Sequence, residues 1–567
     1  MAARDVTEVE AALPKHAEEL ETTRTTPDVE TNNFHGLDLK TILVYVSVNL
    51  IAFAQILNLV GSGAYARNIA AAVGGSTETT WLSQVIAIVT CVLAPPVSQA
   101  ADLWGRKWLI VILTLFGFVG SIVVSRCTSM AMAIGGEVIS AISFGAQPLL
   151  YAVVSEILPR RFRPAAQAGV NVSVALAGIF GLLVGATLID KYTEGFRIYY
   201  YITGAINAVS AILCALFYTP VPRPLQKTLT RAQKFGRLDW IGYALLSSGL
   251  VLFSIALTWS DNPYSWENAH IIAPFVVGVF LLVCLGIYQI KLKKDGMFHH
   301  SLFQQDRNFA IAVVGILVEG MCFFAVNDFF PLELSVLFQT DAFGVGLRFS
   351  ITFFTQIVAC FGIAIYSSMT KTIRLPTTLA FCSIVIFFIL LATVKTSIST
   401  ALWAYPIFLG LGLGICLTCV VTAAQISAPP ALIAITSGLL ISTRSLGGSI
   451  ALPIYTAIFK SKITTSIGSD IAARVLPLGI SQEFLPLFIA GLTTGNESIL
   501  ISVPGVTPQI IQAGARGLQE AYLSSLRYVW VTAAILAFIA ASCSMFLIDP
   551  SQQLNMHVDA PLEEDPA

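Results

Sequence analysis

Charged residues are scarce in this sequence: Asp, Glu, Lys and Arg make up 11% of its 567 residues, whereas 56% are hydrophobic. A soluble protein usually carries about 25% charged residues. The low content of charged residues therefore excludes an ordinary soluble protein. The formal net charge of −1 also gives no reason to expect nucleic acid as a partner.

Signatures of common enzymes and metal proteins are also missing. The sequence contains no P-loop, no His-Glu-x-x-His zinc motif and no nucleophile elbow. Cys416 and Cys419 have the spacing of a metal or redox pair, but they lie inside an apolar run and have no second pair, which favours packing. His299 and His300 are adjacent and do not share a helix face. We expect no enzymatic activity, no metal and no cofactor other than a proton gradient.

What the sequence has instead is a series of apolar runs, each long enough to cross a bilayer as an α-helix. They predict an all-α membrane protein with about fourteen transmembrane helices. The expected spans are residues 41–62, 80–100, 107–125, 130–156, 165–189, 198–218, 239–259, 270–290, 308–328, 345–367, 375–394, 400–424, 431–458 and 528–548.

The cations between these spans support the count, because cytoplasmic loops of membrane proteins carry an excess of Lys and Arg. With the N-terminus inside, the loops on the cytoplasmic side receive most of them, and the outer loops receive few. The cytoplasmic set is Arg106, Lys107, Arg160, Arg161, Arg163, Arg223, Lys227, Arg231, Lys234, Arg237, Lys291, Lys293, Lys294, Arg307, Lys371 and Arg374. The outer set is Arg67, Arg126, Lys191, Arg197 and Lys395.

The span order predicts two six-helix bundles with an extra pair of helices between them (6+2+6). The expected parts are a disordered cytosolic tail (1–36), a first bundle (37–218), a basic linker with two extra spans (219–306), a second bundle (307–550) and a cytosolic tail (551–567). The second bundle includes one long outer loop over 459–527. Its short apolar piece, 484–492, is expected to lie on the membrane or dip into it, and Asn496 is a glycosylation candidate.

A charged turn, Ser98–Leu109, separates the second and third apolar runs. It resembles the loop between the second and third spans of the major facilitator superfamily, whose motif runs Gly-x-x-x-Asp-x-x-Gly-Arg-Lys. Asp102, Gly105, Arg106 and Lys107 match this motif, and its first Gly is replaced. The resemblance implies the major facilitator fold, with parallel halves related by an axis along the membrane normal.

The same resemblance implies a cytoplasmic gate, in which an acid at the end of the fourth span works with the charges of this turn. Glu156 and Arg160 occupy that end, and they can pair at i,i+4 if the helix continues. The gate role therefore extends to Asp102, Arg106, Glu156 and Arg160, with Gly105 and Lys107 of the same turn as further gate candidates. The alternative is that these charges only set the topology.

Three charged residues fall near the middle of predicted spans, where charge is costly and is usually retained for function. They are Glu137, Glu319 and Arg444. Glu137 and Glu319 are candidates for proton coupling, and Arg444 for a counter-charge or a ligand-positioning group. The alternatives for Arg444 are a place near the cytoplasmic surface or a structural ion pair. Related drug:proton antiporters often carry an Arg in the fourth span where this chain has Glu137, so their proton relay does not transfer unchanged.

Several motifs further along resemble the fungal trichothecene efflux pump family: Gly195–Tyr200, Leu238–Tyr243, Trp259–Trp266, Lys294–His300 and Thr443–Ser449. The resemblance implies a fungal, fourteen-span, proton-coupled transporter of the plasma membrane, or alternatively of the vacuolar membrane. Fungal siderophore–iron symporters are close relatives of that family, so direction and substrate stay open.

Three functional hypotheses follow. The first is efflux of a hydrophobic fungal metabolite, toxin or drug in exchange for protons. The second is siderophore–iron uptake with protons, and the third is a transporter-like sensor, against which the short tails argue. The expected partners are the lipid bilayer, a small-molecule substrate and protons, and the superfamily resemblance implies a monomer.

Overall fold

The computed structural model describes residues 39–75, 78–220, 226, 228, 230–259, 264–293, 296–297, 299–304, 306–338, 342–395, 401–429, 432–494, 500, 502–551 and 553–554. These residues belong to one compact unit that begins at Leu39. The predicted N-terminal tail, Asn496 and residues 555–567 lie outside the described residues.

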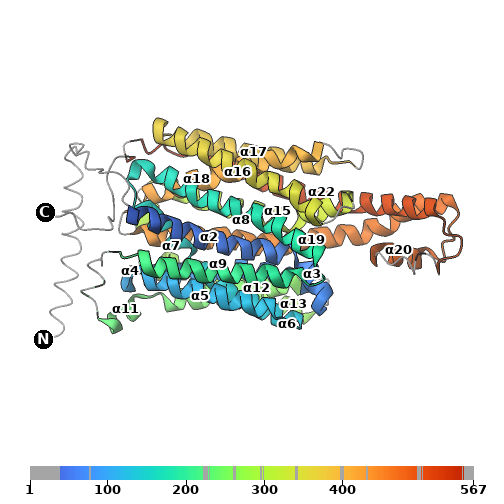
Figure 1. The fold of residues 1–567 in the computed structure, drawn as a ribbon, viewed down its shortest axis with the longest axis horizontal. Coiled ribbons are helices and arrows are strands. Elements are labelled where there is room, and N and C mark those ends of the chain that lie inside the picture. Colours follow the sequence, from blue (N-terminus) through green and yellow to red (C-terminus); the bar gives the residue numbers. More distant parts are fainter. Residues whose placement is uncertain are drawn as a thin grey trace. The chain divides into compact units, whose positions relative to one another are not determined.

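Long α-helices make up the first part of the chain (Figure 1). They are α2 (Leu39–Ala64), α3 (Ala66–Val73), α4 (Thr80–Trp104), α5 (Arg106–Ser125), α6 (Met130–Ala141), α7 (Gln147–Glu156), α8 (Arg163–Lys191) and α9 (Gly195–Phe217). The cation distribution predicts that the end of these helices near Gly105 faces the cytoplasm. We call this the cytoplasmic end, and the opposite end, near Ala64 and Thr80, the outer end.

The fourth predicted span is not one continuous helix. A 3-10 turn, η2 (Ile142–Ala146), joins α6 to α7. Pro148 follows directly in the first turn of α7. Because proline has no backbone N–H, it cannot donate to the carbonyl four residues earlier, and the ladder is interrupted there.

The extra pair consists of α12 (Trp240–Trp259) and α13 (Ala269–Ile287), preceded by the short α11 (Arg231–Arg237). Buried Asp239 ties their cytoplasmic ends together: it accepts hydrogen bonds from the Gly242 amide at 3.0 Å, Tyr288 at 3.2 Å and Gln289 at 2.5 Å. The Tyr243 hydroxyl donates to Gln99 of α4. The pair is therefore fastened to α4.

The last part of the chain is again helical (Figure 1). It comprises α15 (Arg307–Phe338), α16 (Ala342–Thr370), α17 (Arg374–Ala392), α18 (Tyr405–Ile426), α19 (Ile433–Val475), α20 (Leu485–Thr494) and α22 (Pro508–Ser544). Among the described residues, 13 helices are long and apolar enough to cross a membrane. The first half of α19 is too polar to be one of them, but its side chains are buried on nearly all sides between other helices. With α19, the all-α fold of about fourteen spans is confirmed.

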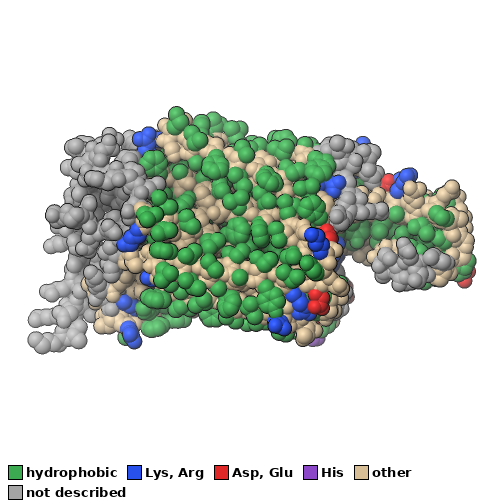
Figure 2. Space-filling view, in the orientation of Figure 1, with side chains coloured by type: hydrophobic (Ala, Val, Ile, Leu, Met, Phe, Trp, Pro, Cys, Tyr) green, Lys and Arg blue, Asp and Glu red, His purple; other side chains and the backbone are tan. Residues whose placement is uncertain are grey.

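Apolar side chains cover the outside of the helices. On α5 the exposed Trp108, Ile112, Leu115 and Val119 recur at three- and four-residue spacing, which places them on one face. Figure 2 shows hydrophobic side chains spread over the long helices, with Lys and Arg near the two ends. This outer surface matches the hydrocarbon of a bilayer.

The segment 459–527, predicted as one long outer loop, is largely helical in the part that the structure describes. Helix α19 continues to Val475 and α22 already begins at Pro508, with α20 between them. Ile471, Phe488 and Ile510 are buried in a small hydrophobic core of this region, and Arg474 pairs with Glu520 at 2.5 Å. The apolar piece 484–492 therefore buries Phe488 against side chains of α19 and α22.

Candidate functional site

The helices before and after the extra pair meet along two seams, α4 with α19 and α8 with α16. In the first seam, Gln84 donates to the Ser449 carbonyl at 3.1 Å and Ser442 to the Cys91 carbonyl at 2.7 Å. In the second, a Cβ on Gly178 would lie 2.7 Å from the Phe353 ring. Both seams are tightly closed in this conformation.

A charged pair lies between α15 and α19. Arg444 donates from Nε to Glu319 Oε2 at 2.6 Å and from Nη2 to Oε1 at 3.0 Å. The Glu319 side chain is 1% exposed and that of Arg444 11%, and the guanidinium also stacks 4.6 Å from the Phe323 ring centre. Arg444 is thus largely enclosed and makes a two-pronged carboxylate contact, and it does not lie at the cytoplasmic surface.

Glycines bring these two helices close enough for the pair to form. A Cβ on Gly320 would lie 2.0 Å from the Arg444 carbonyl oxygen, and one on Gly447 would lie 2.2 Å from the Leu317 carbonyl oxygen. No larger residue fits at either position without moving a helix. The backbone contact therefore fixes the height at which Glu319 and Arg444 face each other.

A cavity between the two seams contains this pair. It measures about 10 Å³, which is room for about one water molecule. The polar residues that line it are Gln147, Tyr151, Glu319, Gln356 and Arg444. The apolar set is Ile56, Val174, Phe323, Leu413 and Leu417. A substrate must enter after the helices move apart.

A hydrogen-bond network closes the cytoplasmic side of the cavity. Gln167 of α8 donates to the Gln425 side chain of α18 at 2.9 Å, and Gln425 in turn donates to Ser437 of α19 at 2.9 Å. Arg163 donates to the Gln425 carbonyl at 3.4 Å. The sequence analysis used Arg163 only to assign the cytoplasmic side of the membrane, and it missed Gln167 and Gln425. The one sequence feature that could have indicated these glutamines is that they are polar residues inside apolar runs.

The predicted gate residues lie at the turn between α4 and α5. Gly105 makes the turn with φ +95°, a backbone conformation that favours glycine. Arg106 pairs with Glu156 through two hydrogen bonds, one of them 2.8 Å, and lies 3.6 Å from Asp102. The cluster therefore joins α4, α5 and α7.

The other two gate candidates are placed differently. Helix α7 ends at Glu156 and Arg160 begins the 3-10 turn η3 (Arg160–Phe162), so the continuous helix expected between them is absent. Pro159 precedes the turn with an extended backbone and breaks the helix. The Lys107 ammonium lies 5.7 Å from the Trp108 ring centre.

Glu137 lies apart from the cavity. It is fully buried among α6, α2 and α9, where it accepts hydrogen bonds from Asn58 at 2.8 Å and Tyr200 at 2.6 Å. The structure thus brings Glu319 and Arg444 together and separates both from Glu137.

Two further carboxylates on α15 were missed by sequence reasoning. Asp328 accepts a hydrogen bond from Ser83 at 3.1 Å, and buried Glu333 accepts one from Trp530 at 2.9 Å. The apolar run predicts a span ending at residue 328, which places Glu333 in an outer loop. The helix in fact continues to Phe338 and carries both acids inside the protein.

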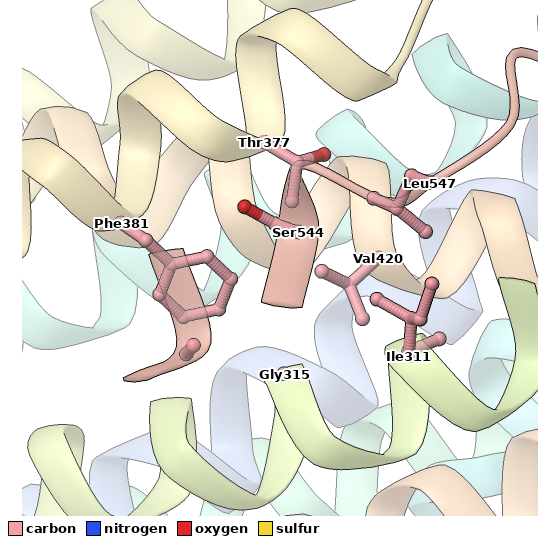
Figure 3. Close-up of a pocket in the computed structure, with 9 residues that line it drawn as sticks. Ile311, Gly315, Thr377, Phe381, Val420, Ser544 and Leu547 are labelled. Atoms are coloured by element: carbon pink, nitrogen blue, oxygen red, sulfur yellow. The ribbon is translucent and has the colours of Figure 1, made fainter. Parts of the chain in front are cut away.

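A second small cavity offers little to a ligand. Figure 3 shows it within the later helices, with Thr377 and Ser544 facing apolar neighbours. It measures about 10 Å³. Both hydroxyls are already engaged, Thr377 with the Ile373 carbonyl and Ser544 with Thr378 and the Ala541 carbonyl.

The part of the chain that the structure describes holds no group of three His, Cys, Asp or Glu side chains suited to a metal ion. Cys416 and Cys419, which have metal-like spacing, are buried free thiols. The chemistry available at the cavity is thus that of one carboxylate, one guanidinium, amides and a phenol.

Comparison with known proteins gives the family. The Major Facilitator Superfamily matches residues 42–452. The MFS-type transporter ucsD of an Acremonium species is 25% identical over 83% of this chain and 77% of its own length. The MFS-type efflux transporter ffsH of Aspergillus flavipes is 26% identical over 86% and 83%.

Solved structures agree in fold. A crystal structure of the peptide transporter POT in complex with sulfate covers 91% of this chain and 96% of its own, with a TM-score of 0.54 and 14% identity. The human organic anion transporter MFSD10 covers 88% and 100%, with a TM-score of 0.51 and 14% identity. The helical arrangement and the match over most of the chain show that this protein belongs to the major facilitator superfamily of membrane transporters.

Proposed function

We propose that this transporter exports a hydrophobic small molecule in exchange for protons. The observation that carries the proposal is the Glu319–Arg444 pair in the wall of the central cavity. Two of the similar proteins, from Aspergillus flavipes and Pyricularia grisea, are efflux transporters. This supports export over uptake.

The pair can couple protons to substrate by competition for one site. In this conformation Glu319 accepts two hydrogen bonds from the Arg444 guanidinium, a charge-assisted, two-pronged contact. A proton on Glu319 removes its negative charge, releases the guanidinium and weakens the α15–α19 contact. Substrate entering the cavity from the inside would then displace the proton, and the reverse exchange would occur outside.

The substrate proposed is neutral and largely apolar, with a few oxygen functions. Ile56, Val174 and Phe323 supply apolar contact area, while Gln147 and Gln356 supply amide groups for hydrogen bonds. A trichothecene-type sesquiterpenoid has this character, and the family resemblance points the same way. We place the protein in the plasma membrane as a monomer.

The direct test is transport in proteoliposomes with an imposed pH gradient. A labelled trichothecene-type sesquiterpenoid is expected to move opposite to the protons, and Glu319→Gln should lower its gradient-driven rate by at least tenfold, because the side chain can no longer ionise. Glu520→Gln is the matched control, since Glu520 of α22 pairs with Arg474 of α19 and does not line the cavity. It should transport at the normal rate.

Parallel liposomes receive a labelled ferric hydroxamate. Movement of this compound together with protons would replace export by siderophore uptake. Binding of either compound without any movement would support a sensor instead. Full gradient-driven transport by Glu319→Gln would remove Glu319 from the coupling step.

A further inference from the structure

The outer end of α15 docks between two helices of the first half of the chain. Asp328 Oδ2 accepts a hydrogen bond from the Ser83 hydroxyl of α4 at 3.1 Å. Its other oxygen, Oδ1, accepts one from the neighbouring Asn327 side chain at 3.3 Å. Both oxygens of the carboxylate are thus used where the two halves meet.

Helix α2 lies against the same two residues. A Cβ on Gly63 would lie 2.4 Å from Asn327 Nδ2 and 3.4 Å from Asp328 Oδ1. The contact is as close as a glycine permits, so Asn327 and Asp328 fill the space between α2 and α4. Ser83, Gly63 and the two α15 residues form what we call the outer gate.

No cation pairs with Asp328 among the described residues. Charged groups on the elements that surround the outer end of α15 include Arg67 on α3, Glu78 ahead of α4, Glu319 and Glu333 on α15, and Arg444, Lys460 and Lys462 on α19, whose Phe459 ring packs against Phe329 beside Asp328. Of these, Arg444 is held by Glu319 and Glu333 by Trp530. The negative charge of Asp328 therefore rests on two neutral donors alone, and the outer gate depends on how strongly they bind it.

We propose that Asp328 is the proton-sensitive residue of the outer gate. Ionised, it accepts both hydrogen bonds with full charge and keeps α15 closed against α2 and α4. A proton from the outer solution converts the carboxylate to a carboxylic acid, weakens both contacts and lets the cavity open outward. When the outer gate closes, the same proton returns to the outer solution. Asp328 therefore controls when the outer gate opens and carries no net proton across the membrane.

This inference rests on the proposed proton-coupled export, which gives an outward opening its use, and it adds a residue that does not touch the cavity. Asp328 is a positioning residue: it acts through Ser83 and the helix contact. External acid thereby favours the conformation in which substrate is released and Glu319 can be reached by protons.

Hydrogen–deuterium exchange tests the gate without any substrate. The full-length protein in phosphatidylcholine nanodiscs is compared at pH 7.5 and pH 5.5, with rates corrected for the intrinsic effect of pH. In the wild-type protein, exchange in peptides covering Thr80–Val89 and Phe323–Phe330 should rise about tenfold at the lower pH, the size expected from weakening a charged hydrogen bond. Asp328→Asn should exchange fast at both pH values.

Two further variants make the result specific. Glu333→Gln removes another carboxylate of α15 and should keep the wild-type response to pH. Ser83→Ala leaves Asp328 in place and should raise exchange at pH 7.5 with a smaller response to acid, which tests the gate even if Asp328→Asn does not fold.

Some outcomes would overturn the inference. A wild-type protein whose exchange does not respond to pH, or an Asp328→Asn variant that responds as the wild type does, would show that Asp328 is not the sensor. Because no substrate is present, this failure is separate from that of proton-coupled export. A responsive gate with gradient-driven transport unaffected by Glu319→Gln would leave Asp328 in its role and remove the proposed coupling.

Discussion

At the scale of single residues, small side chains decide where charged ones can meet. Gly320 and Gly447 allow α15 and α19 to touch through their backbones, and the Glu319–Arg444 contact forms beside them. Sequence reasoning singled out both charged residues, because charge inside an apolar run is conspicuous. It could not predict that they form a pair, because 125 positions separate them and neither segment contains a pattern that indicates its contact partner.

The backbone contact at Gly320 can be tested by adding one methyl group. Gly320→Ala should lower the melting temperature of the purified protein, with a loss of about 1–3 kcal/mol, because the added Cβ collides with the Arg444 carbonyl. Gly362→Ala on α16 is the matched control, since no atom lies within 4 Å of a Cβ there. An equal shift in both variants would contradict the close contact.

At the scale of helices, a buried ion pair holds α5 to α7. The side chains of Arg106 and Glu156 are 6% and 3% exposed. Removing one partner leaves a buried charge without its counterpart, which typically costs about 3–5 kcal/mol.

Arg106→Met alone should therefore lower the melting temperature strongly. The double variant Arg106→Met with Glu156→Leu should recover part of the loss, because apolar residues of similar volume can replace a buried pair, although Asp102, 3.6 Å from Arg106, still loses that neighbour. Melting curves of the single and double variants measure the difference. If the double variant is as unstable as the sum of the two single changes, the two residues act independently.

Helix lengths show where sequence patterns reach their limit. Apolar runs locate the spans because a bilayer requires about 20 apolar residues in a row. They say nothing about helices that continue into water, so α19 and α22 were predicted far shorter than their 43 and 37 residues. The break in the fourth span was equally hidden, since Ile142–Ala146 is as apolar as the helices on either side.

At the scale of the whole molecule, the described residues have more than one hydrophobic core. The main core spans the long helices of both halves, whereas Ile471, Phe488 and Ile510 belong to a smaller one outside the predicted bilayer.

The two cores should therefore unfold independently of each other. Phe488→Ala is expected to cost about 3–5 kcal/mol locally and to expose the outer helices to protease, while the melting temperature of the membrane part stays unchanged. Limited proteolysis beside a thermal melt measures both. Leu487→Ala is the control, since Leu487 is 44% exposed; protease sensitivity as high as that of Phe488→Ala would argue against a separate core.

The closed central cavity also bears on what the protein does when idle. The central cavity has room for about one water molecule and has polar contacts at both ends, so the described residues leave it too small to serve as a continuous aqueous path for ions in this conformation. A membrane that contains many copies in this conformation would therefore keep the ion gradients and the membrane potential on which other transporters depend.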